Sequence, residues 1–168
     1  MGAVTQVYRA SVALSVTNLQ SQPSNATWTT GWAGPTVDNS TNLDLDHLVA
    51  AQFTVAAASL TAGEIRVYLV PQSDDTTWPD IFSTGTEGTQ SASAVLHDVT
   101  TRDVLPLLWA CVTDTDNSRV YTMPQTSVLA RTGLLPRKYF LFVAHSTAQN
   151  LAASGNAVYV TGVSATVA

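Results

Sequence analysis

One stretch of the chain, LDLDHLVAAQFTV, constrains the fold more than any other feature, because apolar and polar residues alternate along it. Successive side chains of a β-strand point to opposite faces, so a period of two predicts a strand with one buried face. The residues expected on the buried face are Leu43, Leu45, Val49, Ala51, Phe53 and Val55. This stretch therefore predicts a half-buried strand of a β-sheet.

Six further segments carry strand signals. SVALSVT predicts a strand with Val12, Leu14 and Val16 pointing inward. GEIRVYLVP predicts a strand that ends at Pro71. Its inward residues are Ile65, Val67 and Leu69, and its outward residues are Glu64, Arg66 and Tyr68. LLWACV and RVYTM flank the turn-forming residues TDTDNS, which predicts a hairpin. KYFLFVAHS predicts a central strand, and GNAVYVTGVSATV predicts a final strand after a turn at Gly155 and Asn156.

These segments predict an all-β fold of about eight strands, an antiparallel and jelly-roll-like β-sandwich. The expected domain spans residues 1–168, with an N-terminal arm over residues 1–10. Residues 73–103 are rich in Ser, Thr, Asp and Gly, which predicts one long loop. Within TTRDVLPLL we expect a short helix capped by Thr100 or Thr101 and limited by Pro106.

The charge content of the chain argues against several classes of partner. Charged residues make up 11% of the sequence, against roughly 25% in typical domains, and the net charge is −5. No basic stripe is present for nucleic acid, and the apolar run Val104–Val112 is shorter than the roughly 20 residues of a membrane helix. We therefore expect no nucleic acid or membrane partner. The N-terminus lacks a signal-peptide pattern, so we expect folding in a cytoplasm.

The sequence offers no recognisable catalytic or metal-binding motif. His47, His97 and His145 are isolated, and no GxSxG motif is present. The acidic clusters at 44–47, 73–75 and 114–117 could offer oxygens to calcium, although turn formation explains them more simply. Cys111 is expected to be a small buried side chain. We expect no enzyme activity, no cofactor and no metal.

Three tryptophans are the candidate interface residues. Trp28, Trp32 and Trp78 lie in or beside the loop-like stretches ATWTTGWAGP and TTWPD. A buried ring of this size removes about 150–250 Å² from water, so exposure of all three would be costly. Trp28 and Trp32 could fill the core from one strand face. Alternatively, the three rings could form a subunit contact or a platform on which sugars stack.

Several runs together resemble the small virion structural proteins of tailed bacteriophages. They are YRASVALSVTNLQS, ATWTTGW, VDNSTNLDLDHLVAAQFTV, AGEIRVYLVP and the ending GNAVYVTGVSATVA, which cover most of the chain. The likeness is to the cement or decoration class, whose members attach to the outside of a capsid and clamp neighbouring capsomers. It is one of overall pattern and transfers no site residue.

The resemblance implies a structural protein on the capsid exterior, made in the cytoplasm of a bacterial host, with the major capsid protein as partner. A charge-poor chain with loop tryptophans also predicts self-association, as a trimer more readily than a dimer. Two alternatives remain open, a tail or collar component of the virion and a carbohydrate-binding β-sandwich module.

Overall fold

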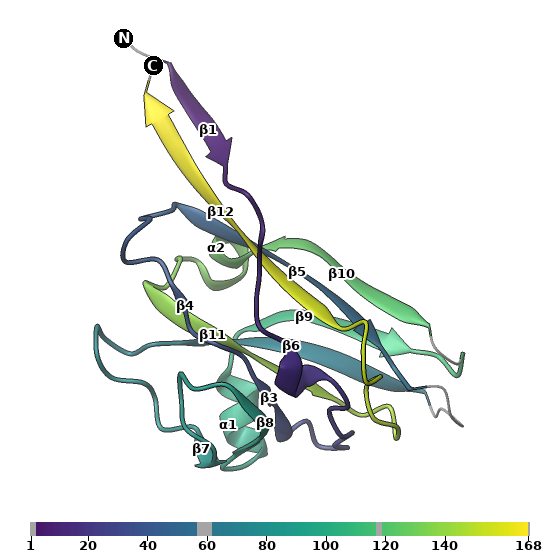
Figure 1. The fold of residues 1–168 in the computed structure, drawn as a ribbon. Coiled ribbons are helices and arrows are strands. Elements are labelled where there is room, and N and C mark those ends of the chain that lie inside the picture. Colours follow the sequence, from purple (N-terminus) through teal and green to yellow (C-terminus); the bar gives the residue numbers. More distant parts are fainter. Residues whose placement is uncertain (1–2, 57–61, 117–118, 168) are drawn as a thin grey trace.

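The computed structural model describes residues 3–56, 62–116 and 119–167, and within them the chain forms an antiparallel β-sandwich (Figure 1). This confirms the expected all-β fold. The strands are β1 Val4–Tyr8, β2 Val12–Ala13, β3 Thr30–Ala33, β4 Val37–Asp38, β5 Asp46–Thr54, β6 Gly63–Pro71, β7 Phe82–Thr84, β8 Ser91–Leu96, β9 Leu107–Thr113, β10 Val120–Ser127, β11 Lys138–His145 and β12 Ala157–Val167. Three short helices join them, η1 Thr17–Leu19, α1 Val99–Val104 and α2 Val128–Thr132.

The strands form two sheets. The smaller sheet has the order β1-β12-β5-β10, with β2 also paired to β12. The larger has the order β7-β8-β3-β11-β6-β9, with β4 paired to β11. The described residues form more strands than the expected eight. Part of the difference comes from β2, β4 and β7, which are only two or three residues long. As predicted, β11 is a central strand and β6 ends at Pro71.

The main core lies between the two sheets and is built from alternate residues of each strand. In β5 the buried residues are His47, Val49, Ala51 and Phe53, which confirms the predicted period. The prediction was wrong for Leu43 and Leu45, which are 72% and 59% exposed. They precede the strand, in a turn where the backbone N–H of Asp44 donates to the Asn39 side chain.

A second apolar cluster covers the outer face of the larger sheet. Tyr68 was expected to point to solvent, but it is buried with Phe140 and Phe142 of β11. The segment expected as a loop over 73–103 forms this cover, because it contains β7, β8 and most of α1. Its apolar residues, among them Phe82 and Leu96, anchor it to the sheet. The cap of α1 is Asp98, which accepts from the backbone N–H of Thr101, rather than either predicted threonine.

The predicted hairpin between LLWACV and RVYTM is wrong. β9 pairs with β6 in the larger sheet, and β10 pairs with β5 in the smaller one. The inward side chains of the two strands, such as Trp109 and Met123, belong to the same core cluster but lie in different sheets. Cys111 is half-buried because β9 is the last strand of its sheet, which corrects the expectation of full burial.

The N-terminal segment runs alongside β12. Residues 4–8, part of the expected arm, form β1 and pair with the end of β12. In the predicted strand SVALSVT only Val12 and Ala13 pair, and Val12 is exposed. Leu14 and Val16 pack against the core as predicted. In the described ranges, no helix is long and apolar enough to cross a membrane.

Candidate interaction surface at the projecting ribbon

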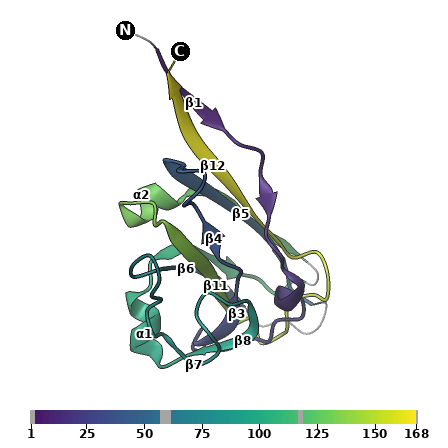
Figure 2. The same cartoon turned by 60° about the vertical axis from the view of Figure 1, so that its left-hand side comes forward.

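The most distinctive surface feature is a two-stranded ribbon that extends beyond the sandwich (Figures 1 and 2). It consists of β1 and residues 163–167 of β12, and we call it the projecting ribbon. The pairing of β12 with β5 ends where Val163 meets Asp46, whereas its pairing with β1 continues to Val167. Beyond Val163 the ribbon is therefore a sheet of two strands.

The projecting ribbon exposes apolar side chains. All five residues of β1 are exposed, and Val4 and Tyr8 have exposed fractions of 71% and 60%. An isolated two-stranded ribbon is marginally stable in water, because it has no buried face of its own. At about 3.3 Å per residue, the four residue pairs beyond Val163 extend roughly 13 Å from the sandwich. The ribbon thus presents both its edges and its faces to a partner.

The root of the ribbon is held by an ion pair between an exposed arginine and a buried aspartate. The Arg9 Nε donates to Asp44 Oδ1 at 2.6 Å, and the side chain of Asp44 is almost fully buried. The backbone N–H of Arg9 also donates to the carbonyl of Gly162 in β12. Asn39 fixes Asp44 from the other side, through bonds to its backbone N–H and carbonyl. Residues far apart in sequence therefore set the position from which the ribbon projects.

His47 extends this cluster into the core. Its Nδ1 lies 2.9 Å from the Tyr139 hydroxyl, and its Nε2 lies 3.6 Å from Asp44 Oδ2. Burial lowers the pKa of His47, although the carboxylates of Asp44 and Asp46 act in the opposite direction. Burial also raises the pKa of Tyr139, which keeps its phenol protonated. These contacts support the prediction that His47 is a satisfied core residue.

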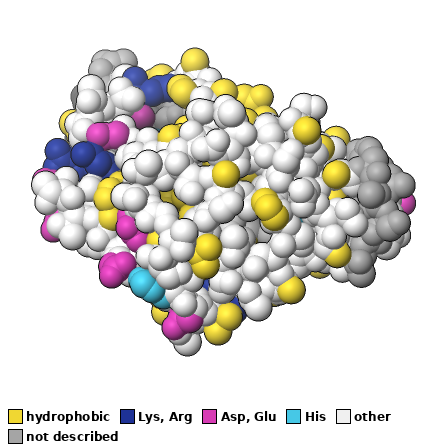
Figure 3. Space-filling model, turned by 60° about the horizontal axis from the view of Figure 1, so that its bottom comes forward, with side chains coloured by type: hydrophobic (Ala, Val, Ile, Leu, Met, Phe, Trp, Pro, Cys, Tyr) yellow, Lys and Arg dark blue, Asp and Glu magenta, His cyan; other side chains and the backbone are white. Residues whose placement is uncertain are grey.

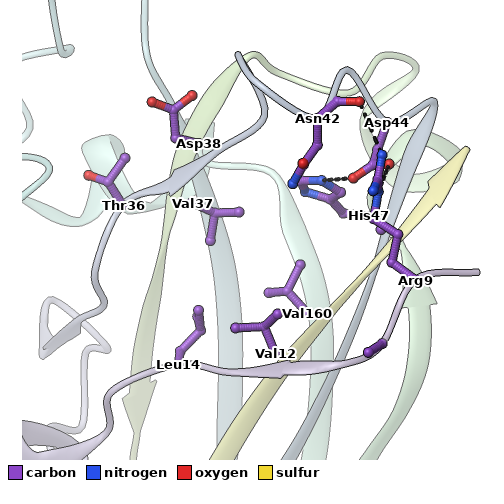
Figure 4. A pocket seen from close by; sticks show the side chains of 12 residues that line it. Arg9, Val12, Leu14, Thr36, Val37, Asp38, Asn42, Asp44, His47 and Val160 are labelled. Carbon is purple, nitrogen blue, oxygen red and sulfur yellow. Dashed lines mark hydrogen bonds and ion pairs between the residues drawn. The ribbon is translucent and has the colours of Figure 1, made fainter.

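Beside the root lies a hollow of about 230 Å³ (Figure 4). Arg9, Asn42 and Asp44 are at its polar end. The apolar side chains that line it are Val12, Leu14, Val37 and Val160. Its size suits one or two apolar side chains and is below the roughly 300 Å³ of the smaller ligand pockets. The hollow therefore extends the apolar surface that begins on the ribbon.

Gly162 has no side chain, which allows β12 to pass close to the Asp44 carboxylate at the root of the ribbon. A Cβ atom at this position would lie 2.2 Å from Asp44 Oδ2. We expect Gly162→Ala to displace the Asp44 carboxylate, weaken its bond to Arg9 and lower the free energy of unfolding by about 1–3 kcal/mol. Chemical denaturation would measure this loss. Ser164→Ala, two residues further along β12, is the matched control and should change stability by less than about 0.5 kcal/mol.

The structure separates the three candidate tryptophans. Trp32 is 0% exposed and belongs to the core between the sheets, which removes it from the candidate interface. Trp28 and Trp78 are half-buried and pack against the second cluster, on the opposite side of the larger sheet. The even spacing of Trp28 and Trp32 suggested one strand face, but Trp28 precedes β3 and has a left-handed backbone with φ of 53°.

Both half-buried rings already have partners within the chain. The Arg66 guanidinium lies 4.0 Å above the Trp28 ring, and the Trp28 Nε1 donates to the carbonyl of Glu64. Trp78 packs on Phe140, and a Cβ at Gly88 would lie 2.4 Å from its Nε1. Trp78 therefore serves mainly to attach the covering segment to the larger sheet, and Trp28 packs the loop before β3 against β6.

The remaining candidate groups are used in local structure. His97 is exposed and contacts Asp80. The Asp74 carboxylate accepts from the backbone of Thr76, and these bonds lower its pKa. In the described part of the chain, no three His, Cys, Asp or Glu side chains gather to form a metal site.

The sequence predicted an N-terminal arm over residues 1–10, which includes β1, but it did not indicate the pairing of β1 with β12 or the Arg9–Asp44 contact. One available signal was the length of the alternating segment at the C-terminus, since β12 has eleven residues and its neighbour β5 has nine. Comparison with protein-family models and with curated proteins gives no match to this chain.

Proposed function

We propose that this protein decorates the outside of a bacteriophage capsid and stabilises it by bridging neighbouring capsomers. The observation that carries the proposal is the projecting ribbon, which gives a small chain a second contact region beyond its sandwich. A bridging protein needs two such regions, one for each subunit that it joins. The resemblance of the sequence to phage cement proteins supports the same role.

The surface of the sandwich is also suited to attachment on a lattice. Most of the face drawn in Figure 3 carries uncharged side chains, and the charged ones gather towards one side of it. Exposed apolar residues occur singly on several elements, for example Val104 of α1 and Val112 of β9. Many weak contacts of this kind become effective when the partner repeats in an array, because each bound copy adds to the total.

The proposed partner is the major capsid protein, and the proposed location is the capsid exterior. A protein that binds assembled subunits but not dispersed ones stabilises the assembly by mass action. This role requires geometry and contact area and no chemical step. The hydrophobic and hydrogen-bonding groups of the ribbon are sufficient for it.

The test is the mechanical and thermal strength of particles. We expect particles that lack the protein to rupture at a lower temperature than complete particles, and purified protein to restore the original value. A variant that lacks residues 3–8 should fail to restore it, because the ribbon is lost while the sandwich core is kept. Measurement of genome release on heating would follow both effects.

Val112→Ser is the matched control, because it removes one exposed valine on β9, outside the ribbon, and the loss of a single weak contact among many should have little effect. It should restore the particles as the wild type does. If particles without the protein are as robust as complete ones, the cement role is wrong. Electron microscopy of the native particle would then distinguish a tail or collar position, whereas glycan binding by the isolated protein would indicate a carbohydrate-binding module.

A further inference from the structure

We propose that the projecting ribbon is a dimerisation element, in which β1 pairs antiparallel with β1 of a second copy. The two ribbons would form a continuous four-stranded sheet with the order β12-β1-β1-β12. The two-fold axis of this sheet would pass beside Gln6. The proposal stands on the geometry of the ribbon and does not require the capsid role.

The outer edge of β1 is open to a partner strand. Among the described residues β1 pairs with β12 alone, so one side of its backbone has no partner in the chain. Its sequence, VTQVY, contains no charged residue and no proline. Natural proteins normally protect exposed edges with such residues, with bulges or with short strands. An unprotected edge of alternating N–H and C=O groups is complementary to one kind of ligand, an extended strand.

The edges of β10, β7 and β9 differ from β1 in this respect. β10 contains Pro124 and a bulge between Met123 and Thr126. β7 has only three residues. β9 lies against β10 and α2 of its own chain. Among these edges, the ribbon is the one that stands away from the rest of the molecule (Figures 1 and 2).

The second copy fits this edge because β1 is complementary to itself. Antiparallel pairing about Gln6 places Val4 opposite Tyr8 of the second copy, and Thr5 opposite Val7. Each exposed apolar side chain of β1 then gains a neighbour across the new ladder, and pairs of β-branched and aromatic residues are favourable there. No charge repulsion opposes the contact. The same patch is used by both copies, so the assembly closes as a dimer.

The shape of the molecule permits this arrangement. The ribbon stands clear of the sandwich in both views, so a second ribbon can lie alongside it (Figures 1 and 2). Because the ribbons run antiparallel, the two sandwiches lie at opposite ends of the four-stranded sheet. A ribbon that is marginal as two strands becomes part of a four-stranded sheet, which has the strand number needed for stability. If the capsid role also holds, each sandwich binds one capsomer and the paired ribbons join the two copies, so the ribbon reaches the second capsomer through the second copy.

Sedimentation equilibrium tests the proposal, with substitutions at two exposed positions. The wild type should have twice the 17.8 kDa mass of the chain at high micromolar concentration. The double variant Val4→Lys with Tyr8→Lys places like charges opposite each other at both ends of the contact. We expect it to weaken dimerisation by about tenfold or more. The matched variant Val4→Lys with Tyr8→Glu places opposite charges there and should restore the dimer.

Restoration is the decisive result, because a general loss of ribbon structure would affect both double variants alike. A monomer or a trimer of the wild type would overturn the proposal, and a trimer would agree with the expectation from composition. Equal dimerisation of both double variants would overturn the register. If the protein is a dimer but does not change particle stability, the ribbon pairing is supported and the capsid role is contradicted. If it is a monomer that stabilises particles, the capsid role is supported and the ribbon pairing is contradicted.

Discussion

Trp32→Ala should lower the free energy of unfolding by about 3–5 kcal/mol, the usual cost of removing a fully buried ring. Trp32 is among the largest fully buried side chains, and its ring packs so closely that a Cβ at Gly34 would lie 2.7 Å from it. For a chain of this size the change corresponds to a decrease in Tm of roughly 10 °C. Calorimetry or denaturant titration would measure it.

Two further variants separate the causes of this loss. The Trp32 Nε1 is buried and has no acceptor within reach among the described residues. Trp32→Phe keeps most of the ring and removes that unpaired N–H, so we expect a cost below about 1.5 kcal/mol. Trp78→Ala affects a half-buried ring and should cost less than Trp32→Ala. If Trp32→Ala were as stable as the wild type, the ring would not lie in the core.

Acid should destabilise the protein strongly between pH 6.5 and pH 4, and His145 should be a principal cause. The side chain is fully buried, and burial lowers its pKa to about 4. Its hydrogen-bond partners, the Gln22 carbonyl and the Thr147 hydroxyl, carry no charge. Below pH 6.5 the unfolded chain therefore binds a proton that the folded chain does not, and stability falls as the pH falls.

The expected loss from His145 is about 2 kcal/mol at pH 5 and about 3 kcal/mol at pH 4, relative to pH 7. His47, whose pKa is also lowered, adds to the loss in the same direction. Denaturation at a series of pH values would measure the slope. His145→Gln should flatten it, although the variant is less stable at pH 7. His97→Gln, at an exposed position, should keep the wild-type slope, and an unchanged slope for His145→Gln would contradict the assignment.

Trp32 and His145 lie in the sandwich, whereas the proposed contacts lie on the ribbon. Loss of particle binding by Trp32→Ala would reflect unfolding and not a missing contact. Substitutions at Val4 and Tyr8 should leave the stability of the sandwich unchanged, because both residues are exposed. Stability measurements should therefore accompany each binding experiment.

The sequence by itself determined the local structure where one face of a strand is buried. The alternation in β5 and β6 placed Val49, Phe53, Ile65 and Val67 in the core, because the period of a strand decides which side chains share a face. The turn at Gly155, which has φ of 87°, preceded the last strand as expected. These features depend on neighbours in the sequence, and local patterns report them well.

Tertiary structure decided which segments lie side by side. The sequence favoured a hairpin for β9 and β10, but each pairs with a strand far away in the chain. The segment over 73–103 has the composition of a loop, yet it covers a face of the larger sheet through a few apolar anchors.

The sequence predicted an N-terminal arm, but tertiary structure decided that this arm becomes one strand of the candidate interaction surface. The ribbon exists because β12 continues past the end of β5 and pairs with β1, a contact between the two ends of the chain. Its root depends on Arg9 and Asp44, which are 35 positions apart. Periodicity reports the face on which a side chain lies, but it carries no information about the partner strand. That choice is made by the packing of the whole chain, and it decides which edges remain open for other molecules.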